Sequence, residues 1–214
     1  MKEKPYNIIT ISRQMGSSGT YIGYLAAKEL GFKYLDREIL RQAANKLGIE
    51  PSMLEQYDGR SASLMENIVQ SFCFGASEMP NLQPLGRPVY NKDLFALESK
   101  IMKDVADQCS AVIVGRGGFY ILKDRPNAIH IFIHAPLDYR IERIMKEQKI
   151  VDRRKAQKMI DESDHERTKF IRDMVSADWF DARNYHLCID SSVVGFPACV
   201  EMITQLVNMK RSAQ

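Results

Sequence analysis

Residues 6–36 read YNIITISRQMGSSGTYIGYLAAKELGFKYLD, and this stretch is the most informative about the fold. The β-branched run from Ile8 to Ile11 has the length of a strand and leads into the small residues 16–19. Apolar residues then recur at helical spacing until Gly31, which stands where a helix C-cap is favoured. A strand, a small-residue turn and a helix in this order direct backbone N–H groups and the helix dipole at one spot. The stretch therefore predicts a phosphate-binding loop.

The loop departs from the phosphate-loop pattern G-x-x-x-x-G-K-[ST]. When the two are aligned on Gly16 and the helix, the lysine position falls at about Gly19 and the leading glycine position near Arg13. Thr20, or a serine beside it, supplies the hydroxyl that such loops offer to Mg²⁺. On the motif alone, a structural turn that binds no ligand stays open as the alternative.

The rest of the chain alternates helical and strand patterns. Helical spacing covers 37–47, 62–74, 92–108, 119–123, a stretch opened by Pro136, and 198–208; strands are expected at about 7–12, 32–36, 111–115, 129–134 and 186–190. This order predicts a three-layer α/β fold with a five-stranded parallel sheet covered by helices on both faces. Because ligands bind beyond the carboxyl ends of such strands, residues 13–20, 36–37, 115–117 and 190 should share one crevice.

The composition narrows the functional class. The 214 residues suit a single domain, and a net charge of +3 gives no argument for nucleic-acid binding. No apolar run approaches the roughly 18 residues of a membrane span, and the N-terminus lacks a secretory signal pattern. The four widely spaced cysteines favour reduced thiols, and the four scattered histidines favour structural roles over a zinc site. We therefore expect a cytoplasmic protein.

Four stretches, residues 9–40, 112–122, 129–146 and 164–192, resemble the cytidylate kinase-like family, relatives of the bacterial CMP kinases. Together they cover most of the chain. The resemblance implies a P-loop kinase-like domain over 1–214, an acceptor-binding insertion at 50–91 and a lid at 147–178. It also implies ATP with Mg²⁺ as the phosphoryl donor and CMP or dCMP as the acceptor. Tyr90 and Arg60 are among the side chains available in the insertion, but none of its residues matches individually.

The same resemblance assigns roles to individual residues. The donor nucleotide would contact the loop and the helix after the fourth strand, through Arg13, Gly16, Ser17, Ser18, Gly19, Thr20 and Arg143, with Thr20 on the metal. The acceptor would contact Asp36, Arg37, Arg41 and Arg116. The transferring phosphoryl group would meet Arg116, Arg140, Arg167 and Arg172. Arginine suits these positions because its planar fork binds phosphate with two hydrogen bonds and keeps its charge.

For several of these residues the pattern leaves a structural role open. Arg116 could form an ion pair with a neighbouring carboxylate, and Asp36 could cap the helix that follows it. Arg140 and Arg143, at i and i+3, could belong to a solvated helix face. Residues 153–172 mix basic and acidic side chains, which also fits a plain charged helix. Gly117 stands where CMP kinases usually carry an aspartate, and no arginine occupies the family position near 160–163.

Two functional hypotheses follow. The first is a nucleoside monophosphate kinase-like phosphotransferase that acts on CMP, dCMP or a related small acceptor. The second is a nucleotide-binding or regulatory module without catalysis on the same fold, because the loop lacks its lysine. A cation on the transferring phosphate is worth roughly 10³ to 10⁵ in rate, and Arg13 or a lid arginine is available to supply it. Oligomeric state does not follow from the sequence.

Overall fold

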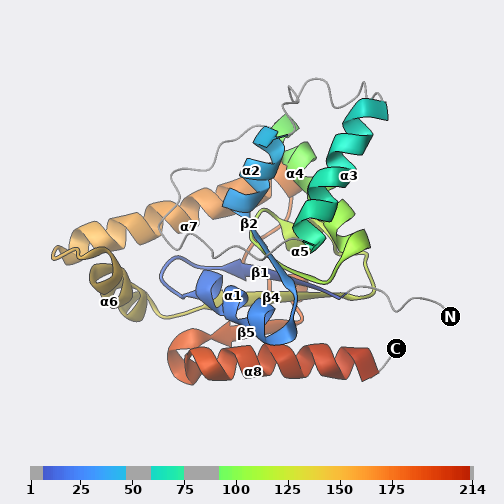
Figure 1. Cartoon of the computed structure of the whole chain (residues 1–214). Helices are drawn as coiled ribbons and strands as arrows, with labels where there is room; N and C mark the ends of the chain where they lie inside the picture. The colour runs from blue at the N-terminus through green and yellow to red at the C-terminus, as the bar shows by residue number, and fades with distance from the viewer. Residues whose placement is uncertain (1–6, 47–58, 75–91, 213–214) are drawn as a thin grey trace.

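The structure is a computed structural model of the chain, and it describes residues 7–46, 59–74 and 92–212. Five parallel strands form one sheet: β1 Ile8–Arg13, β2 Lys33–Asp36, β3 Ala111–Val114, β4 Ala128–His134 and β5 Leu187–Asp190. Their order across the sheet is β2-β3-β1-β4-β5, so β1 lies at the centre (Figure 1). The predicted α/β class with a five-stranded parallel sheet is confirmed.

Helices cover both faces of the sheet (Figure 1). They are α1 Gly19–Leu30, α2 Arg37–Lys46, α3 Gly59–Phe74, α4 Lys92–Gln108, α5 Gly118–Ile121, α6 Leu137–Gln148, α7 Arg153–Val175 and α8 Ser191–Ser212, with a short 3-10 helix at Ala182–Asn184. Each expected strand and helix is present within a few residues of its predicted bounds. The described part of the expected 50–91 insertion is α3; residues 50–58 and 75–91 lie outside the described residues.

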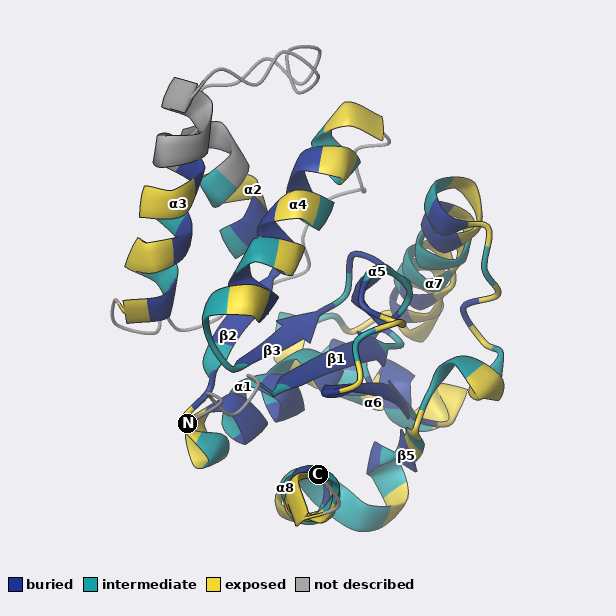
Figure 2. Cartoon of the chain, turned by 90° about the vertical axis from the view of Figure 1, so that its right-hand side faces the viewer, coloured by how far each residue is buried: buried dark blue, intermediate teal, exposed yellow. Residues whose placement is uncertain are grey.

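Alternating side chains on the central strand divide the core into two layers. Ile8 packs with α3 and α4, whereas Ile9 and Ile11 pack with α1 and α8. Figure 2 shows the strands as a buried layer between these helices. Gly31 ends α1 with φ 67°, as its position predicted, because its N–H can then bond back to the last turn of the helix.

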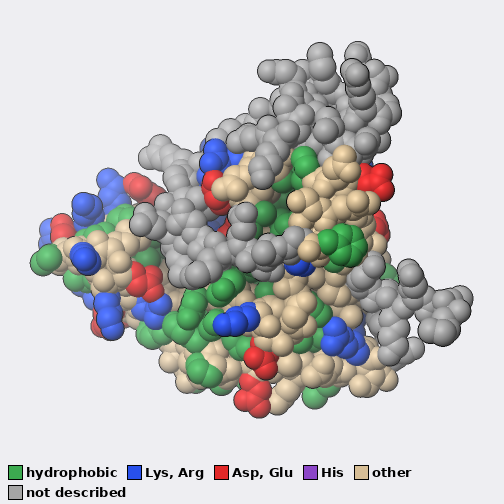
Figure 3. All heavy atoms as spheres, in the orientation of Figure 1, with side chains coloured by type: hydrophobic (Ala, Val, Ile, Leu, Met, Phe, Trp, Pro, Cys, Tyr) green, Lys and Arg blue, Asp and Glu red, His purple; other side chains and the backbone are tan. Residues whose placement is uncertain are grey.

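The helices α6 and α7 form an arm that projects from one end of the sheet (Figure 1). Ile141 and Ile144 of α6 pack against Ala156 and Ile160 of α7, which gives the arm a small core of its own. On its surface, side chains of both charges are interspersed (Figure 3). This arm covers most of the expected lid region 147–178.

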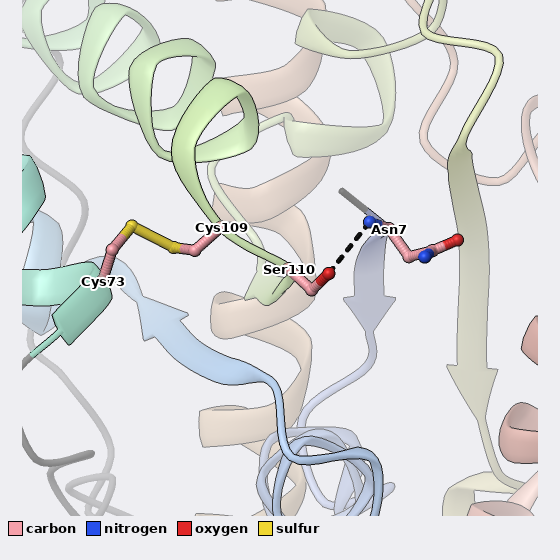
Figure 4. The surroundings of a disulfide bond; sticks show 4 residues. All are labelled: Asn7, Cys73, Cys109 and Ser110. Atoms are coloured by element: carbon pink, nitrogen blue, oxygen red, sulfur yellow. Dashed lines mark hydrogen bonds between the residues drawn. A yellow bond between two sulfur atoms is a disulfide. The ribbon is translucent and has the colours of Figure 1, made fainter. Parts of the chain in front are cut away.

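A disulfide joins Cys73 at the end of α3 to Cys109 after α4, with 5.7 Å between the two Cα atoms (Figure 4). Nearby, Asn7 N donates to Ser110 Oγ at 3.0 Å, which attaches the start of β1 to the same corner. The expectation of reduced thiols is therefore wrong for this pair, because the packing of α3 on α4 brings together cysteines 36 positions apart. Cys188 and Cys199 are free thiols.

The last helix, α8, meets the length and composition of a membrane span, with a mean hydropathy of 1.2. The window is not a continuous apolar run in the sequence, because Glu201 and several polar residues interrupt it. In the structure Gly195, with φ 73°, kinks this helix near its start. Beyond the kink, Cys199, Ile203 and Val207 are buried against the sheet and α1. The apolar side of α8 therefore contributes to the core.

Candidate active site

A cavity of about 1230 Å³ lies at the carboxyl ends of β1, β2 and β3 and extends to α6 and α7. The loop after β1, the start of α2, the turn 115–117 and the inner side of the arm line it. This is the crevice that the rule for parallel sheets predicts. Asp190 is the exception, because it does not line the cavity: its Oδ1 accepts from Ser192 N at 2.9 Å and caps α8.

Unusual backbone conformations shape the loop after β1. Gly16 has φ 80°, and a Cβ there would lie 2.9 Å from the Cβ of Arg140, so the position admits only glycine without displacement. Ser18 has φ 61° and precedes α1 without a side-chain cap. Within the described residues, the amides of Gly16, Ser18, Gly19 and Thr20 donate to no protein acceptor. The loop thus presents unbonded N–H groups at a helix N-terminus, which is the arrangement that binds phosphate.

Ser17 differs from its neighbours in the loop. It is fully buried, and its Oγ lies 2.9 Å from Gln14 O and 3.1 Å from Ile133 O. Its carbonyl accepts from Ser191 Oγ at 2.8 Å. Ser17 therefore anchors the loop to the sheet, and its side chain does not reach the cavity that its neighbours line.

Five arginines from distant segments line the cavity: Arg13, Arg37, Arg116, Arg143 and Arg167. Burial, together with the positive charge of Arg13, lowers the pKa of Arg167 to about 10 against the opposing effect of Asp164. Burial also lowers the pKa of Arg37, and Arg116 and Arg13 act in the same direction. Guanidinium groups that destabilise one another's charge would be stabilised by a bound polyanion.

Arg116 follows β3 in a left-handed conformation, with φ 50°. It forms a buried ion pair with Glu98 of α4, and its guanidinium carbon lies 4.2 Å from the centre of the Phe170 ring. Burial raises the pKa of Glu98, and the charge of Arg116 opposes that shift. The ion-pair interpretation of Arg116 is therefore correct, and the same side chain also lines the cavity.

Arg140 does not lie on a solvated helix face, because it is 7% exposed. Its Nε donates to Ala135 O at 3.0 Å, and its Nη1 donates to Asp164 Oδ2 at 2.6 Å. Asp164 Oδ1 in turn accepts from Met15 N at 2.9 Å and from Arg167 Nη1 at 3.0 Å. Asp164 therefore links the phosphate-binding loop, α6 and α7, while Arg140 stays behind the cavity lining.

The remaining predicted residues fall into two groups. Arg143 lines the cavity beside Phe196, 4.7 Å from the ring centre, and forms an ion pair with Glu147. Arg41 and Arg172 do not reach the cavity: Arg41 pairs with Glu38 on an exposed face of α2, and Arg172 points to a shallow surface depression near Trp179. In α7, Arg172 lies about 140° around the helix from Arg167, so helical phase turns it away from the cavity. Arg41 lies on the same side of α2 as Arg37 but one turn farther along, where it pairs with Glu38.

Asp36 ends β2 and lines the cavity, but its oxygens already have partners. Oδ1 accepts from the amides of Glu38 and Ile39, and Oδ2 accepts from Tyr34 Oη at 3.2 Å. The helix-capping interpretation of Asp36 is therefore correct.

The chemistry of the cavity fits ATP better than a dedicated metal cage. No group of three or more acidic, histidine or cysteine side chains with metal-binding geometry occurs in the described part of the chain. The Thr20 hydroxyl accepts from Arg13 Nε at 3.2 Å and keeps a second lone pair. Since Mg²⁺ is usually bound through substrate phosphates with one or two protein oxygens, Thr20 remains a suitable ligand.

Three residues of the site escaped the sequence analysis. Glu98 and Asp164 hold arginines in place, and Phe170 forms part of the wall. Glu98 carried a signal, because it is an acidic residue at an otherwise apolar helical spacing in α4. Asp164 lies in a run of mixed charges in α7, where no local pattern sets it apart.

Comparisons with known proteins agree with this architecture. A sequence model of the cytidylate kinase-like family matches residues 8–193. A search of curated proteins found no match. A crystal structure of an uncharacterized protein from Eubacterium ventriosum is 22% identical, with a TM-score of 0.67 over 94% of this chain and 98% of that one. A shikimate kinase from Bacteroides thetaiotaomicron is 11% identical, with a TM-score of 0.51 over 94% and 98%. At these identities the likeness concerns the fold alone.

Proposed function

From the premise that this chain belongs to the cytidylate kinase-like family, we propose that it transfers a phosphoryl group from ATP to a small acceptor, CMP or dCMP in the first instance. One observation carries the proposal: a loop with unbonded amides and the side chains of five arginines converge on a single cavity. Phosphoryl transfer requires little beyond such positioning and electrostatic stabilisation. The protein would therefore be an enzyme whose substrates are small molecules.

The cavity divides into a donor side and an acceptor side. On the donor side, the amides of Gly16 to Thr20 would bind the ATP phosphates, and Arg143 would lie near the nucleotide. Mg²⁺, held by the phosphates and Thr20, would neutralise charge on the β- and γ-phosphates. On the acceptor side, Arg37 and Arg116 would bind the acceptor phosphate at the ends of β2 and β3.

The arm formed by α6 and α7 would act as the lid over 147–178. Its Arg167 enters the cavity, and Asp164 ties the arm to the loop through Met15 N. Residues 50–91, of which α3 is described, would form the acceptor-binding segment. A lid that excludes water would protect the transferring phosphoryl group from hydrolysis.

The test is to incubate the purified protein with Mg-ATP and each of several nucleoside monophosphates, and to follow ADP formation. Acceptor-dependent ADP supports the proposal and identifies the substrate. Arg116→Ala combined with Glu98→Gln removes both charges of the buried pair and should abolish acceptor dependence while ATP still binds. Arg183→Ala is the matched control, because Arg183 pairs with Asp181 on the surface and lies outside the cavity. A rate that does not respond to any acceptor would refute the proposal.

A second candidate is a nucleotide-binding module without transfer, and Gly19 at the lysine position favours it. It predicts that ATP raises the melting temperature while no acceptor yields ADP. The same assay therefore separates the two functions.

A further inference from the structure

The phosphate-binding loop differs from G-x-x-x-x-G-K-[ST] at three positions: Ser18 stands at the second glycine, and the other two positions depend on each other. The pattern has glycine at the first position and lysine at the seventh, whereas this chain has Arg13 and Gly19 there. The cationic side chain therefore stands at the end of β1 in this chain, whereas the pattern has it at the start of α1.

The structure shows why the two positions change together. A Cβ at Gly19 would lie 2.4 Å from the Cβ of Arg13 and 3.0 Å from its Cγ, closer than side-chain atoms approach one another. The loop therefore has room for a side chain at 13 or at 19, and Arg13 takes that room. Farther out, Nη1 of Arg13 lies 2.3 Å from where a Cβ at Gly115 would be. Arg13 thus runs between two glycines, along the floor of the cavity.

Arg13 differs in its bonding partners from three other arginines that line the cavity. Arg116, Arg143 and Arg167 each form an ion pair with a carboxylate, from Glu98, Glu147 and Asp164 respectively. Among the described residues, Arg13 forms no such pair, and the hydrogen bond of its guanidinium goes to the Thr20 hydroxyl. Its terminal nitrogens therefore have donors to offer to an anion beside the open amides of the loop.

We propose that Arg13 supplies, from the opposite side of the loop, the positive charge that the absent lysine would place on the transferring phosphoryl group. The inference rests on the proposed function and names the residue that makes it possible. In the step itself, an oxygen of the acceptor phosphate forms the new bond to the γ-phosphorus, and the bond to the bridging oxygen of ADP breaks. Arg13 donates hydrogen bonds to the γ-phosphoryl oxygens and keeps its proton throughout.

The first experiment compares wild type, Arg13→Ala, and the reversed loop Arg13→Gly with Gly19→Lys. We expect Arg13→Ala to lower kcat about 10³-fold with little change in the KM of the acceptor. The reversed loop should regain at least about a tenth of the wild-type rate, since it places glycine and lysine at the first and seventh positions as in the pattern. Arg183→Ala again serves as the control. An Arg13→Ala rate within about threefold of wild type would overturn the inference while leaving the proposed function intact.

The second experiment needs no catalysis. Gly19→Ala should lower Tm by about 4 °C or more in the wild-type background and by clearly less in the Arg13→Gly background, because only glycine removes the Cβ that the new methyl group would meet. Equal losses in both backgrounds would show that the two positions are independent and would overturn the exchange.

If wild type forms no ADP with any acceptor, the proposed function fails, and the affinities for ATP and ADP decide the inference. Arg13→Ala should then reduce the preference for ATP over ADP about tenfold or more, because Arg13 acts on the γ-phosphate. An unchanged preference would overturn the inference as well.

Discussion

Removing the Asp164 carboxylate should cost more stability than any other single change in the arm. This side chain is 13% exposed and accepts hydrogen bonds from Arg140, Arg167 and Met15 N. Breaking a buried ion pair from one side costs about 3–5 kcal/mol. Without Asp164, Arg140 still donates hydrogen bonds to two backbone carbonyls. The loss of the Arg140–Asp164 ion pair should therefore cost an amount near the lower end of that range.

The other two interactions add smaller amounts. Arg167 is 26% exposed and lies one turn away on the same helix, so this pair contributes below about 1 kcal/mol. The amide of Met15 would lose its acceptor, at a cost of about 1–3 kcal/mol. Since these effects are not additive, we expect Asp164→Ala to lower the free energy of unfolding by about 4 kcal/mol. Asp164→Asn keeps an acceptor oxygen and should lose about 2 kcal/mol.

Urea unfolding at pH 7, followed by circular dichroism, measures these losses through the midpoint at unchanged slope. Asp173→Ala is the matched control, because Asp173 lies on the same helix in an exposed ion pair and should change the free energy by less than about 0.5 kcal/mol. A loss below about 1 kcal/mol in Asp164→Ala would refute the view that this carboxylate joins the loop to the arm.

Three further predictions concern the rest of the molecule. Reduction of the bond between Cys73 and Cys109 should lower the free energy of unfolding by about 4 kcal/mol, because it frees a loop of 36 residues in the unfolded chain; an unchanged urea midpoint in dithiothreitol would contradict this. Burial lowers the pKa of His130 to about 4. As the pH falls from about 6.5, the imidazole therefore takes up a proton in the unfolded chain before it does so in the folded one, and the free energy of unfolding should fall by up to about 3 kcal/mol by pH 4. Urea midpoints of His130→Asn should show a shallower fall over the same range. Gly115→Ala should cost about 1–3 kcal/mol, because φ is +86° there, and should also slow phosphoryl transfer by displacing the guanidinium of Arg13; a variant as stable and as active as wild type would show that neither constraint holds.

The class of fold and the position of the phosphate-binding loop could be predicted from the amino-acid sequence alone. Strand and helix periodicity is a local property, so the run from Ile8 to Ile11, the small residues before α1 and the C-cap at Gly31 could all be read directly. The rule that ligands bind at the carboxyl ends of parallel strands then located the cavity without any coordinates.

The partners and the burial of individual charged side chains, by contrast, became apparent in the tertiary structure alone. Met15 and Asp164 are 149 positions apart, and Arg116 and Glu98 are 18 apart on different elements, so no spacing could reveal these partnerships. Arg172 faces away from Arg167 around α7, and Arg41 pairs with Glu38 one turn beyond Arg37. Arg140 is buried, where it supports the loop. The same packing paired Cys73 with Cys109 and placed Arg13 in the space left by Gly19. Periodicity records which face of an element is apolar, whereas a polar contact depends on where two distant backbones meet.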